Sequence, residues 1–427
     1  MPLIAQPPPR QLYDVLVIGG GPAGTTTAAL LASKGYTVVL VEKDRHPRFH
    51  IGESLLPRNM PVLRRLGVLD EVTEIGVVKR GADFSDAHDN TYVIFDFSNA
   101  LAPDEPTALQ VKREEFDHIL INNAATKGVT VMQSARITDV QFVSASIEAT
   151  VEGEDGNEIQ LHARFAVDAS GRDAFLSTRL GLKRRNPKHN SVAVFGHFSG
   201  VPRRHGDESG NISVYWFPHG WFWLIPLNDG RMSIGMVCWP KFMKTRQGTL
   251  EQFFWDGVAL APHMQVRMQD AKPLGEIIAT GNFSYTSTQM TGDRFLLVGD
   301  AYAFIDPVFS SGVYLAMQGA EFAAEAVDGY LREPHKAAKH MKKYERRVSR
   351  GLEQFSWFIY RFTSPAMRYL FTHPTNYLGI RAAVTSVLSG DIFGRTVLWP
   401  RLMAFRTLYY VFSLVFWRAG KAYRDRF

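Results

Sequence analysis

The chain has 427 residues, 45% of them hydrophobic and 21% charged, which is typical of a globular protein and excludes a disordered one. This length predicts two domains, or one domain with an extension. The formal charge is +6, and the single cysteine, Cys238, excludes a disulfide within the chain and suits a reducing cytoplasm. The first residues, MPLIAQPPPRQLYD, lack the apolar core of a signal peptide and indicate a Pro-rich arm.

A nucleotide-binding pattern follows this arm. Three elements are predicted, a strand, a helix and a second strand, at residues 13–18, 23–34 and 37–41. Between the first two, Gly19, Gly21 and Gly24 form G-x-G-x-x-G. The first glycine permits a tight turn, the second lets the backbone approach a pyrophosphate, and the third lets the helix pack closely. Glu42 follows the second strand, where an acid binds ribose hydroxyls, so a Rossmann-type dinucleotide site is predicted.

Three later segments indicate which dinucleotide binds. Residues 167–172 read VDASGR, and residues 295–307 read FLLVGDAYAFIDP, a strand followed by Gly-Asp and a turn. An aspartate that leaves a strand, here Asp300, can hold a ribityl hydroxyl, and the next helix start can polarise a flavin carbonyl. Residues 111–117, VKREEFD, add Arg113 near a helix start.

These segments resemble the FAD-binding family that includes para-hydroxybenzoate hydroxylase, the aromatic monooxygenases and the flavin-dependent halogenases. The resemblance runs from about Tyr13 to Tyr330. It implies an α/β fold with a Rossmann-type, glutathione-reductase-like FAD-binding domain at 1–330, an inserted β-sheet substrate domain at about 80–110 and 190–287, and a helical C-terminal region at 331–427. The implied FAD contacts are Gly19, Gly21, Ala23, Gly24, Glu42, Lys43, Arg113, Gly299, Asp300, Pro307 and Gly312.

One motif narrows the resemblance to the flavin-dependent halogenases. Residues 220–226 read GWFWLIP, and Trp221 to Pro226 match the W-x-W-x-I-P pattern of that family. Two residues apart on a strand, the indoles share one face, which would also suit an ordinary core wall. The resemblance implies instead that Trp221 and Trp223 wall the flavin off from the organic substrate. Three further segments support it, PRFHIGESLLP, VVKRGADF and DPVFSSG, at residues 47–57, 77–84 and 306–312.

The resemblance also implies the chemistry. FAD reduced by a separate flavin reductase, O2 and chloride or bromide would give hypohalous acid, with the halide held by the amides of Ser311 and Gly312. Lys79 would then form a haloamine, or hydrogen-bond the oxidant and make the halogen more electrophilic. Partial desolvation suits both roles because it lowers the pKa of the amine. Without these motifs, Lys79 would be read as a solvated loop lysine. No metal site is predicted.

The halide segment departs from the tryptophan halogenases, which carry a glutamate just before its serine. Phe309 occupies that position here. The resemblance therefore implies a ring activated by its own substituent, a phenol or pyrrole, either free or carried as a thioester by a carrier protein. Glu53 is the nearest motif acid, but a catalytic role is not assigned to it, and His50 is read as structural or as a flavin neighbour.

The C-terminal region is expected to be helical, and the sequence leaves more than one role open for two of its segments. Residues 332–350 contain eight Lys/Arg and two acids, a solvated helix face or a dock for an acidic carrier protein or anionic lipid; no nucleic-acid motif accompanies them. Residues 407–417, TLYYVFSLVFW, are too few to span a bilayer but could lie on a membrane, or pack on the domain or a second subunit. The cations that bracket them are Arg401, Arg406, Arg418, Lys421, Arg424 and Arg426.

Two alternatives to a halogenase stay open. An aromatic hydroxylase of the same fold would consume NADPH when substrate binds and insert oxygen without halide. A flavin-bearing partner in a biosynthetic complex, recruited through residues 332–350, would turn over nothing with reduced FAD.

Overall fold

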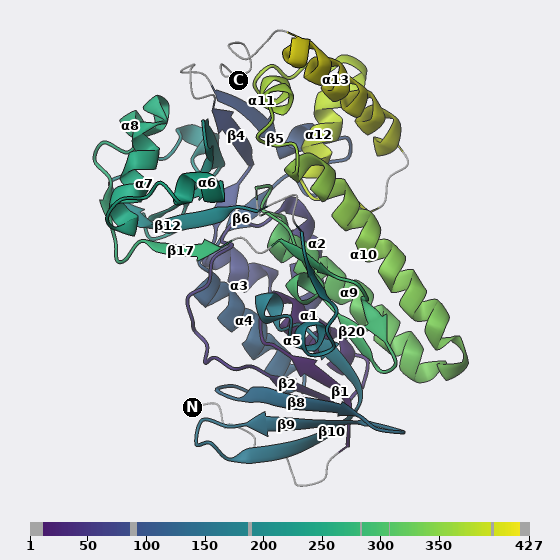
Figure 1. Cartoon of the computed structure of the whole chain (residues 1–427). Coiled ribbons are helices and arrows are strands. Elements are labelled where there is room, and N and C mark those ends of the chain that lie inside the picture. The colour runs from purple at the N-terminus through teal and green to yellow at the C-terminus, as the bar shows by residue number, and fades with distance from the viewer. Residues whose placement is uncertain are drawn as a thin grey trace.

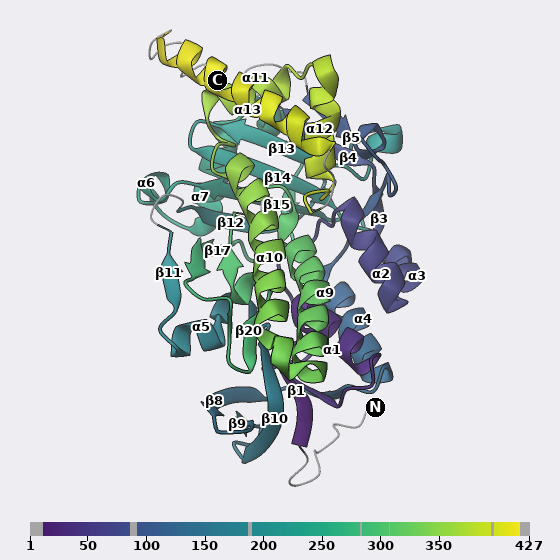
Figure 2. The same cartoon turned by 90° about the vertical axis from the view of Figure 1, so that its right-hand side faces the viewer.

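The computed structural model describes residues 12–85, 92–186, 190–281, 284–306, 308–393 and 397–418. Four residues named from the sequence, Pro307, Lys421, Arg424 and Arg426, lie outside the described residues. Two large sheets lie at opposite ends of the long axis, and the helices α9 and α10 run between them (Figures 1 and 2).

The first sheet carries the nucleotide turn. Its parallel core has the order β7-β2-β1-β10-β20, and β9, β8 and β19 add antiparallel pairs. The strands are β1 (Leu12–Ile18), β2 (Val38–Val41), β7 (Thr130–Met132), β8 (Arg136–Phe142), β9 (Ile147–Glu152), β10 (Glu158–Asp168), β19 (Thr291–Gly292) and β20 (Phe295–Leu297). In register, Ile18 lies beside Val41 and Asp168, and Asp168 beside Leu297. The carboxyl ends therefore meet at one edge, where open α/β sheets bind ligands.

Both faces of this sheet are covered, which explains the continuous apolar run in β1. Val15 and Val17 belong to a core shared with the helices, whereas Leu16 and Ile18 face a core built with β8 and β9. The helices that contribute to the first core or border it are α1 (Pro22–Ala32), α2 (Met60–Leu66), α3 (Leu69–Glu74), α4 (Arg113–Thr126), α9 (Ser311–Arg332) and α10 (Ala337–Ile359). Pro22 occupies the first turn of α1, where its fixed φ and missing N–H are tolerated.

The second sheet has the order β16-β12-β15-β14-β13-β4-β5, and β17 pairs with β12. Its strands are β4 (Gly81–Ser85), β5 (Tyr92–Asp96), β12 (Val192–Ser199), β13 (Ile212–Phe217), β14 (Gly220–Pro226), β15 (Met232–Cys238), β16 (Lys272–Pro273) and β17 (Ile278–Gly281). The predicted insertion at about 80–110 and 190–287 overlaps this sheet; its limits as a domain stay a prediction.

Alternation along β14 decides what each side chain meets. Every residue of β14 is buried. Trp221, Trp223 and Ile225 belong to a core shared with the C-terminal helices, whereas Phe222 and Leu224 face the helices α6 (Pro240–Met243), α7 (Leu250–Ala259) and α8 (Pro262–Arg267). The W-x-W-x-I spacing therefore sends both indoles to one side of the sheet.

The remaining elements connect these layers. Two small sheets have the orders β11-β18-β21 and β3-β6, and they comprise β3 (Val77–Lys79), β6 (Ala108–Gln110), β11 (Lys183–Arg185), β18 (Tyr285–Ser287) and β21 (Ala303–Phe304). A short helix, α5 (Phe175–Arg179), follows β10. The short 3-10 helices are η1 (Pro57–Asn59), η2 (Phe97–Asn99), η3 (Gly171–Asp173), η4 (Gly206–Glu208), η5 (Gly299–Ala301), η6 (Pro334–Lys336) and η7 (Tyr377–Gly379).

The C-terminal region is helical, as predicted. It contains α10, α11 (Pro365–Thr372), α12 (Ile380–Leu388) and α13 (Leu398–Arg418), with α13 outermost in Figure 2. Pro365 begins α11, and Pro400 lies in the first turn of α13, where proline is tolerated because the first N–H groups of a helix have no partner within it. Among the described helices, none is both long and apolar enough to cross a membrane.

Candidate functional site

The nucleotide turn lies at the carboxyl edge of the first sheet, immediately before α1. Gly19 has φ +104°, in the left-handed region that favours glycine, and a Cβ there would lie 2.5 Å from the Ala169 carbonyl oxygen. A Cβ on Gly24 would lie 1.9 Å from the Gly19 oxygen. Both glycines are therefore required by close backbone approach, and the turn leaves the first N–H groups of α1 facing outward.

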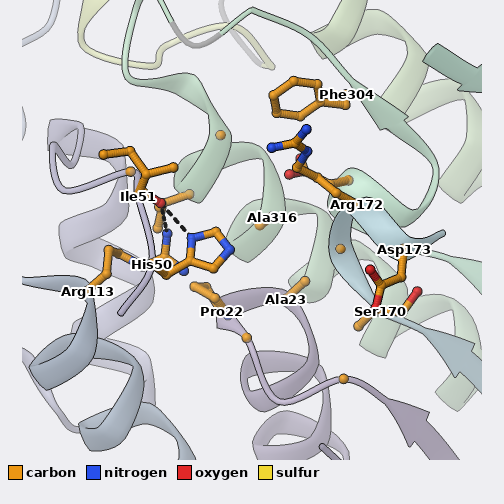
Figure 3. A pocket seen from close by; sticks show the side chains of 18 of the residues that line it. Pro22, Ala23, His50, Ile51, Arg113, Ser170, Arg172, Asp173, Phe304 and Ala316 are labelled. Carbon is orange, nitrogen blue, oxygen red and sulfur yellow. Dashed lines mark hydrogen bonds between the residues drawn. The ribbon is translucent and has the colours of Figure 1, made fainter. Parts of the chain in front are cut away.

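A cavity of about 840 Å³ opens at this edge and continues beneath the second sheet. Figure 3 shows the part between the start of α1, with Pro22 and Ala23, and Ala316 of α9. Of the residues predicted from the sequence, those that line it are Gly19, Gly21, Ala23, Glu42, Lys43, Arg113, Trp221, Trp223, Asp300 and Gly312. Lys79, Gly24, Gly299 and Ser311 do not line it.

The acid after β2 is held by the chain itself. Glu42 accepts hydrogen bonds from the backbone N–H of Gly20 and, at 2.9 Å, of Asp44. Its neighbour Lys43 forms an ion pair with Asp173 across the cavity rim. These contacts fix Glu42 beside the turn, where its remaining lone pairs can accept from ribose hydroxyls.

Arg113 is buried at the start of α4 and holds the segment around Ile51. Its guanidinium binds both carboxylate oxygens of Asp117 at 2.8 Å and donates to the Ile51 carbonyl at 2.8 Å. The same carbonyl lies 2.7 Å from Nδ1 of His50, and Figure 3 shows both contacts converging on it. Burial raises the pKa of Asp117, but the charge of Arg113 outweighs this and holds the pKa below its usual range.

Gly299 and Asp300 lie between α1 and α9. Gly299 has φ +60°, and a Cβ there would lie 3.3 Å from Ala316 and 3.4 Å from Ala23. Burial raises the pKa of Asp300 to about 6. Asp300 lines the cavity, where a carboxylate can accept hydrogen bonds from hydroxyl groups of a ligand.

The predicted halide turn forms the start of α9. Ser310 adopts a left-handed conformation, φ 56°, and α9 begins at Ser311. Gly312 lines the cavity, while the Ser311 side chain is buried and its Oγ has no hydrogen-bond partner among the described residues. The first N–H groups of a helix lack intrahelical partners, so this turn presents free donors next to the cavity.

The tryptophan pair forms a wall of the cavity. The ring centroids of Trp221 and Trp223 are 5.9 Å apart at 50°, and Trp223 Nε1 donates to Ser233 Oγ at 3.3 Å. Gly235 makes room for the second indole, because a Cβ there would lie 2.2 Å from the Trp223 ring. Trp221 also lines a separate void of about 10 Å³, too small for a substrate, beside Phe362.

Lys79, at the end of β3, is 1% exposed, unlike a solvated loop lysine. Its Nζ donates to Ser54 Oγ at 2.9 Å and to the Leu55 carbonyl at 3.1 Å, and lies 5.4 Å from the Phe97 ring centroid. Burial lowers the pKa of Lys79 to about 7. Because Ser54 lines the cavity, its hydroxyl connects the cavity wall to the buried amine.

Phe309 lies in an aromatic cluster that Phe362 connects to Trp221. Its ring contacts those of Phe358, Phe362 and Phe371, with centroids 5.4 to 6.2 Å apart. The same core contains Phe97, which borders Lys79. No carboxylate occupies this position, as the sequence indicated.

Among the cavity residues, Arg172 and Ser54 were missed by the sequence reasoning, and Glu53 was named without a role. Arg172, in the VDASGR segment, binds the Thr280 hydroxyl and the Gly281 carbonyl at 2.8 Å and faces the Phe304 ring (Figure 3). Ser54 and Glu53 stand in the quoted GES segment; Glu53 lies 2.7 Å from His197 Nε2. The motif letters were a usable signal, but the partners come from distant strands that the sequence does not pair with them.

The residues around the cavity fit FAD. The turn leaves no space for a Cβ at Gly19 or Gly24, and at Gly21 it opens on the cavity. Helix starts border the cavity, and cationic side chains at its wall match a pyrophosphate: Lys43, Arg48, Arg113 and Arg172. The fold and the site together define an FAD-dependent flavoprotein of the oxidoreductase type. The family model for the FAD binding domain matches residues 12–354, most of the chain.

Comparison with known proteins identifies the class of flavoprotein to which the chain belongs. The 1H-pyrrole-2-carbonyl-[peptidyl-carrier protein] chlorinase of Pseudomonas fluorescens is 29% identical, covering 89% of this chain and 90% of that protein. Tryptophan 2-halogenase of Chondromyces crocatus is 36% identical over 78% of this chain and 64% of its own length. The structure of the myxobacterial chondrochloren halogenase CndH is 34% identical, with a TM-score of 0.77 and 82% of each chain covered. The chain belongs to the flavin-dependent halogenases.

Proposed function

We propose that the protein halogenates an electron-rich aromatic ring, a phenol or pyrrole, and that Lys79 transfers the halogen. One observation carries the proposal: the Lys79 amine is buried, its pKa is lowered to about 7, and it is bonded to a residue of the cavity wall. When bound in its reduced form, FAD supplies with O2 the oxidising power that converts halide to hypohalous acid. The reduction is assigned to a separate flavin reductase.

In this proposal, three sets of residues have separate roles. The turn from Ser310 to Gly312 holds the halide with backbone N–H groups, which bind it without the strong attraction of a full cation. Trp221 and Trp223 separate the FAD cavity from the aromatic cluster around Phe309. The hypohalous acid passes Ser54 to reach Lys79, because this hydroxyl is the contact between cavity wall and amine.

The transfer at Lys79 is a balanced exchange. The neutral amine and hypohalous acid form a haloamine and water, and the haloamine then exchanges its halogen for a ring hydrogen, which restores the amine. An ammonium has no lone pair for the first step, so a pKa near 7 keeps a reactive fraction at neutral pH. Burial, the cause of this pKa, thus prepares the lysine for the reaction.

The substrate class follows from Phe309. With no carboxylate at this position to remove the ring proton, the ring must be activated by its own hydroxyl or nitrogen. The pyrrole chlorinase relative acts on a ring held by a peptidyl carrier protein. We include a carrier-bound ring among the substrates to be tested, together with free phenols and pyrroles.

The test is product mass spectrometry. The full chain is incubated with FAD, a flavin reductase, NADH and bromide or chloride, and with each candidate ring, free or carrier-bound. The proposal expects exchange of one ring hydrogen for halogen with wild type and none with Lys79→Met. Lys339→Met, a change at an exposed lysine of α10, is the matched control and should retain activity.

Two other outcomes would contradict the proposal. Ring hydroxylation without halide, with NADPH consumed in the absence of a reductase, would indicate an aromatic hydroxylase. Binding of a carrier protein with no product from any ring would indicate a non-catalytic flavin-binding partner.

A further inference from the structure

Helix α13 has two apolar faces, and the described residues of the chain cover one of them. Its buried side chains are Leu398, Leu402, Phe405, Tyr409 and Phe416, at helical spacing, and they pack on the rest of the C-terminal region. The prediction that residues 407–417 pack on the domain therefore holds for one face only. The other face needs a separate explanation.

The second face carries large apolar side chains in solvent. They are Met403, Tyr410, Val411, Leu414, Val415 and Trp417, half to two-thirds exposed, with Trp417 at 67%. Their three-, four- and seven-residue spacing places most of them along one side of the helix. We call these six residues the exposed apolar face of α13. In Figure 2 the helix lies at the outer end of the molecule, and the described residues leave these six side chains exposed. A contiguous apolar face of this kind marks an interaction surface.

From residue 392 to residue 424, the charged residues in the sequence are of one sign. Residues 392–424 contain six Lys/Arg and no Asp or Glu. In the described part of the chain, Arg361, Arg401, Arg406 and Arg418 form no ion pair. Arg361 lies over the Trp357 ring and donates to the Tyr410 hydroxyl, so it borders the face directly. The partner is therefore expected to be negatively charged.

A second copy of the chain fits this surface poorly, because pairing two such faces brings the arginines of both helices together, and like charges repel. An acidic carrier protein matches the charge but not the long row of apolar side chains. A helix with arginines at its borders, and with Trp and Tyr on its apolar face, matches the boundary between lipid headgroups and acyl chains. At 21 residues and about 1.5 Å per residue, α13 is about 31 Å long and can lie along that boundary.

We propose that the exposed apolar face of α13 docks the protein on anionic membrane surfaces. Docking sets the C-terminal region against lipid, and its core is continuous from Phe405 of α13 to Phe309 and Phe97. The inference concerns binding alone and stands whether or not the proposed halogen transfer is correct. Its test needs no turnover.

The experiment is flotation of the full-length FAD-loaded protein with vesicles of phosphatidylcholine alone or mixed with phosphatidylglycerol. Wild type is expected to float with the anionic vesicles and to be released by salt. Val411→Glu with Leu414→Glu should weaken this binding at least about tenfold. Both positions are half exposed, so the variant is expected to fold, which its FAD content and circular dichroism will confirm.

The matched control reverses two exposed cations of α10, Lys339→Glu with Lys342→Glu. It lowers the net charge more than the α13 variant does, yet it should keep vesicle binding within about twofold, because α10 lies outside the docking face. No flotation of wild type with anionic vesicles would overturn the proposal. A dimer seen in light scattering would also overturn it if Val411→Glu with Leu414→Glu abolished the dimer. Capture of an acidic carrier protein without vesicle binding would do the same if this variant abolished the capture.

Discussion

Replacing Lys79 by methionine removes a buried amine and keeps the length of the side chain. In the folded protein burial lowers the pKa of Lys79 from 10.5 to about 7. The unfolded chain therefore binds a proton that the folded chain does not bind between these two values. At about 1.36 kcal/mol for each pKa unit, the buried amine lowers the free energy of unfolding by about 5 kcal/mol below pH 7. This loss disappears as the pH rises through 10.5.

Removing the amine stabilises the variant below pH 7, but the loss of two hydrogen bonds opposes this stabilisation. Ser54 and the Leu55 carbonyl lose their donor, at about 1–3 kcal/mol each when left unpaired. These losses do not depend on pH, whereas the cost of the buried amine does. The free energy of unfolding of Lys79→Met, relative to wild type, is therefore expected to be about 3 kcal/mol larger at about pH 6.5 than at about pH 9.5.

The assay is urea denaturation of both proteins at equal FAD concentration and at both pH values. All other titrating groups are shared, so their contributions cancel in the difference. The surface variant Lys339→Met should stay within about 0.5 kcal/mol of wild type at either pH. If the difference for Lys79→Met does not change with pH, the amine titrates near its ordinary pKa and the reasoning about its neutral form is refuted.

Three further changes test the cofactor site and the wall. Gly24→Ala places a Cβ 1.9 Å from the Gly19 oxygen, so bound flavin per protein, read by absorbance, should fall at least about tenfold; full flavin content would contradict the close packing of the turn. Gly235→Ala pushes a Cβ to 2.2 Å from the Trp223 ring, and should lower product per reduced FAD consumed at least about threefold while flavin stays bound; an unchanged ratio would argue against a wall. Burial raises the pKa of Asp300 to about 6, so wild-type FAD affinity should rise as the pH rises through 6, when the carboxylate forms, and Asp300→Asn should show no such rise in fluorescence titrations.

The sequence predicted those parts of the molecule that depend on neighbouring residues. The turn at Gly19 and Gly24 is decided by backbone clashes within a few residues, so its glycines reveal it. The two indoles of β14 share a face because strand side chains alternate. The family resemblance predicted the second sheet and the helical C-terminal region, and the structure contains both.

The environment of Lys79 could not be predicted in the same way. Its own strand has three residues, and the groups that bury it, Ser54, Leu55 and Phe97, come from other segments. The partners of Arg172 come from β17, more than a hundred residues away in the sequence. Long-range packing decides such contacts, and no local pattern encodes it.

The exposed apolar face of α13 also needed the structure. The sequence of a short hydrophobic run such as residues 407–417 does not show whether the helix is wholly buried, half buried or exposed. Only the packing of Phe405 and Tyr409 on the domain separates the covered side from the free one.

The central claim is that the buried Lys79 amine carries the halogen from the FAD cavity to the ring. It is tested most directly by a single turnover of Lys79→Met with pre-reduced FAD, O2 and bromide, in the presence of both a halogen scavenger and the aromatic substrate. We predict that the scavenger is halogenated to the wild-type extent while the ring receives no halogen. Ring product at the wild-type rate would contradict the claim.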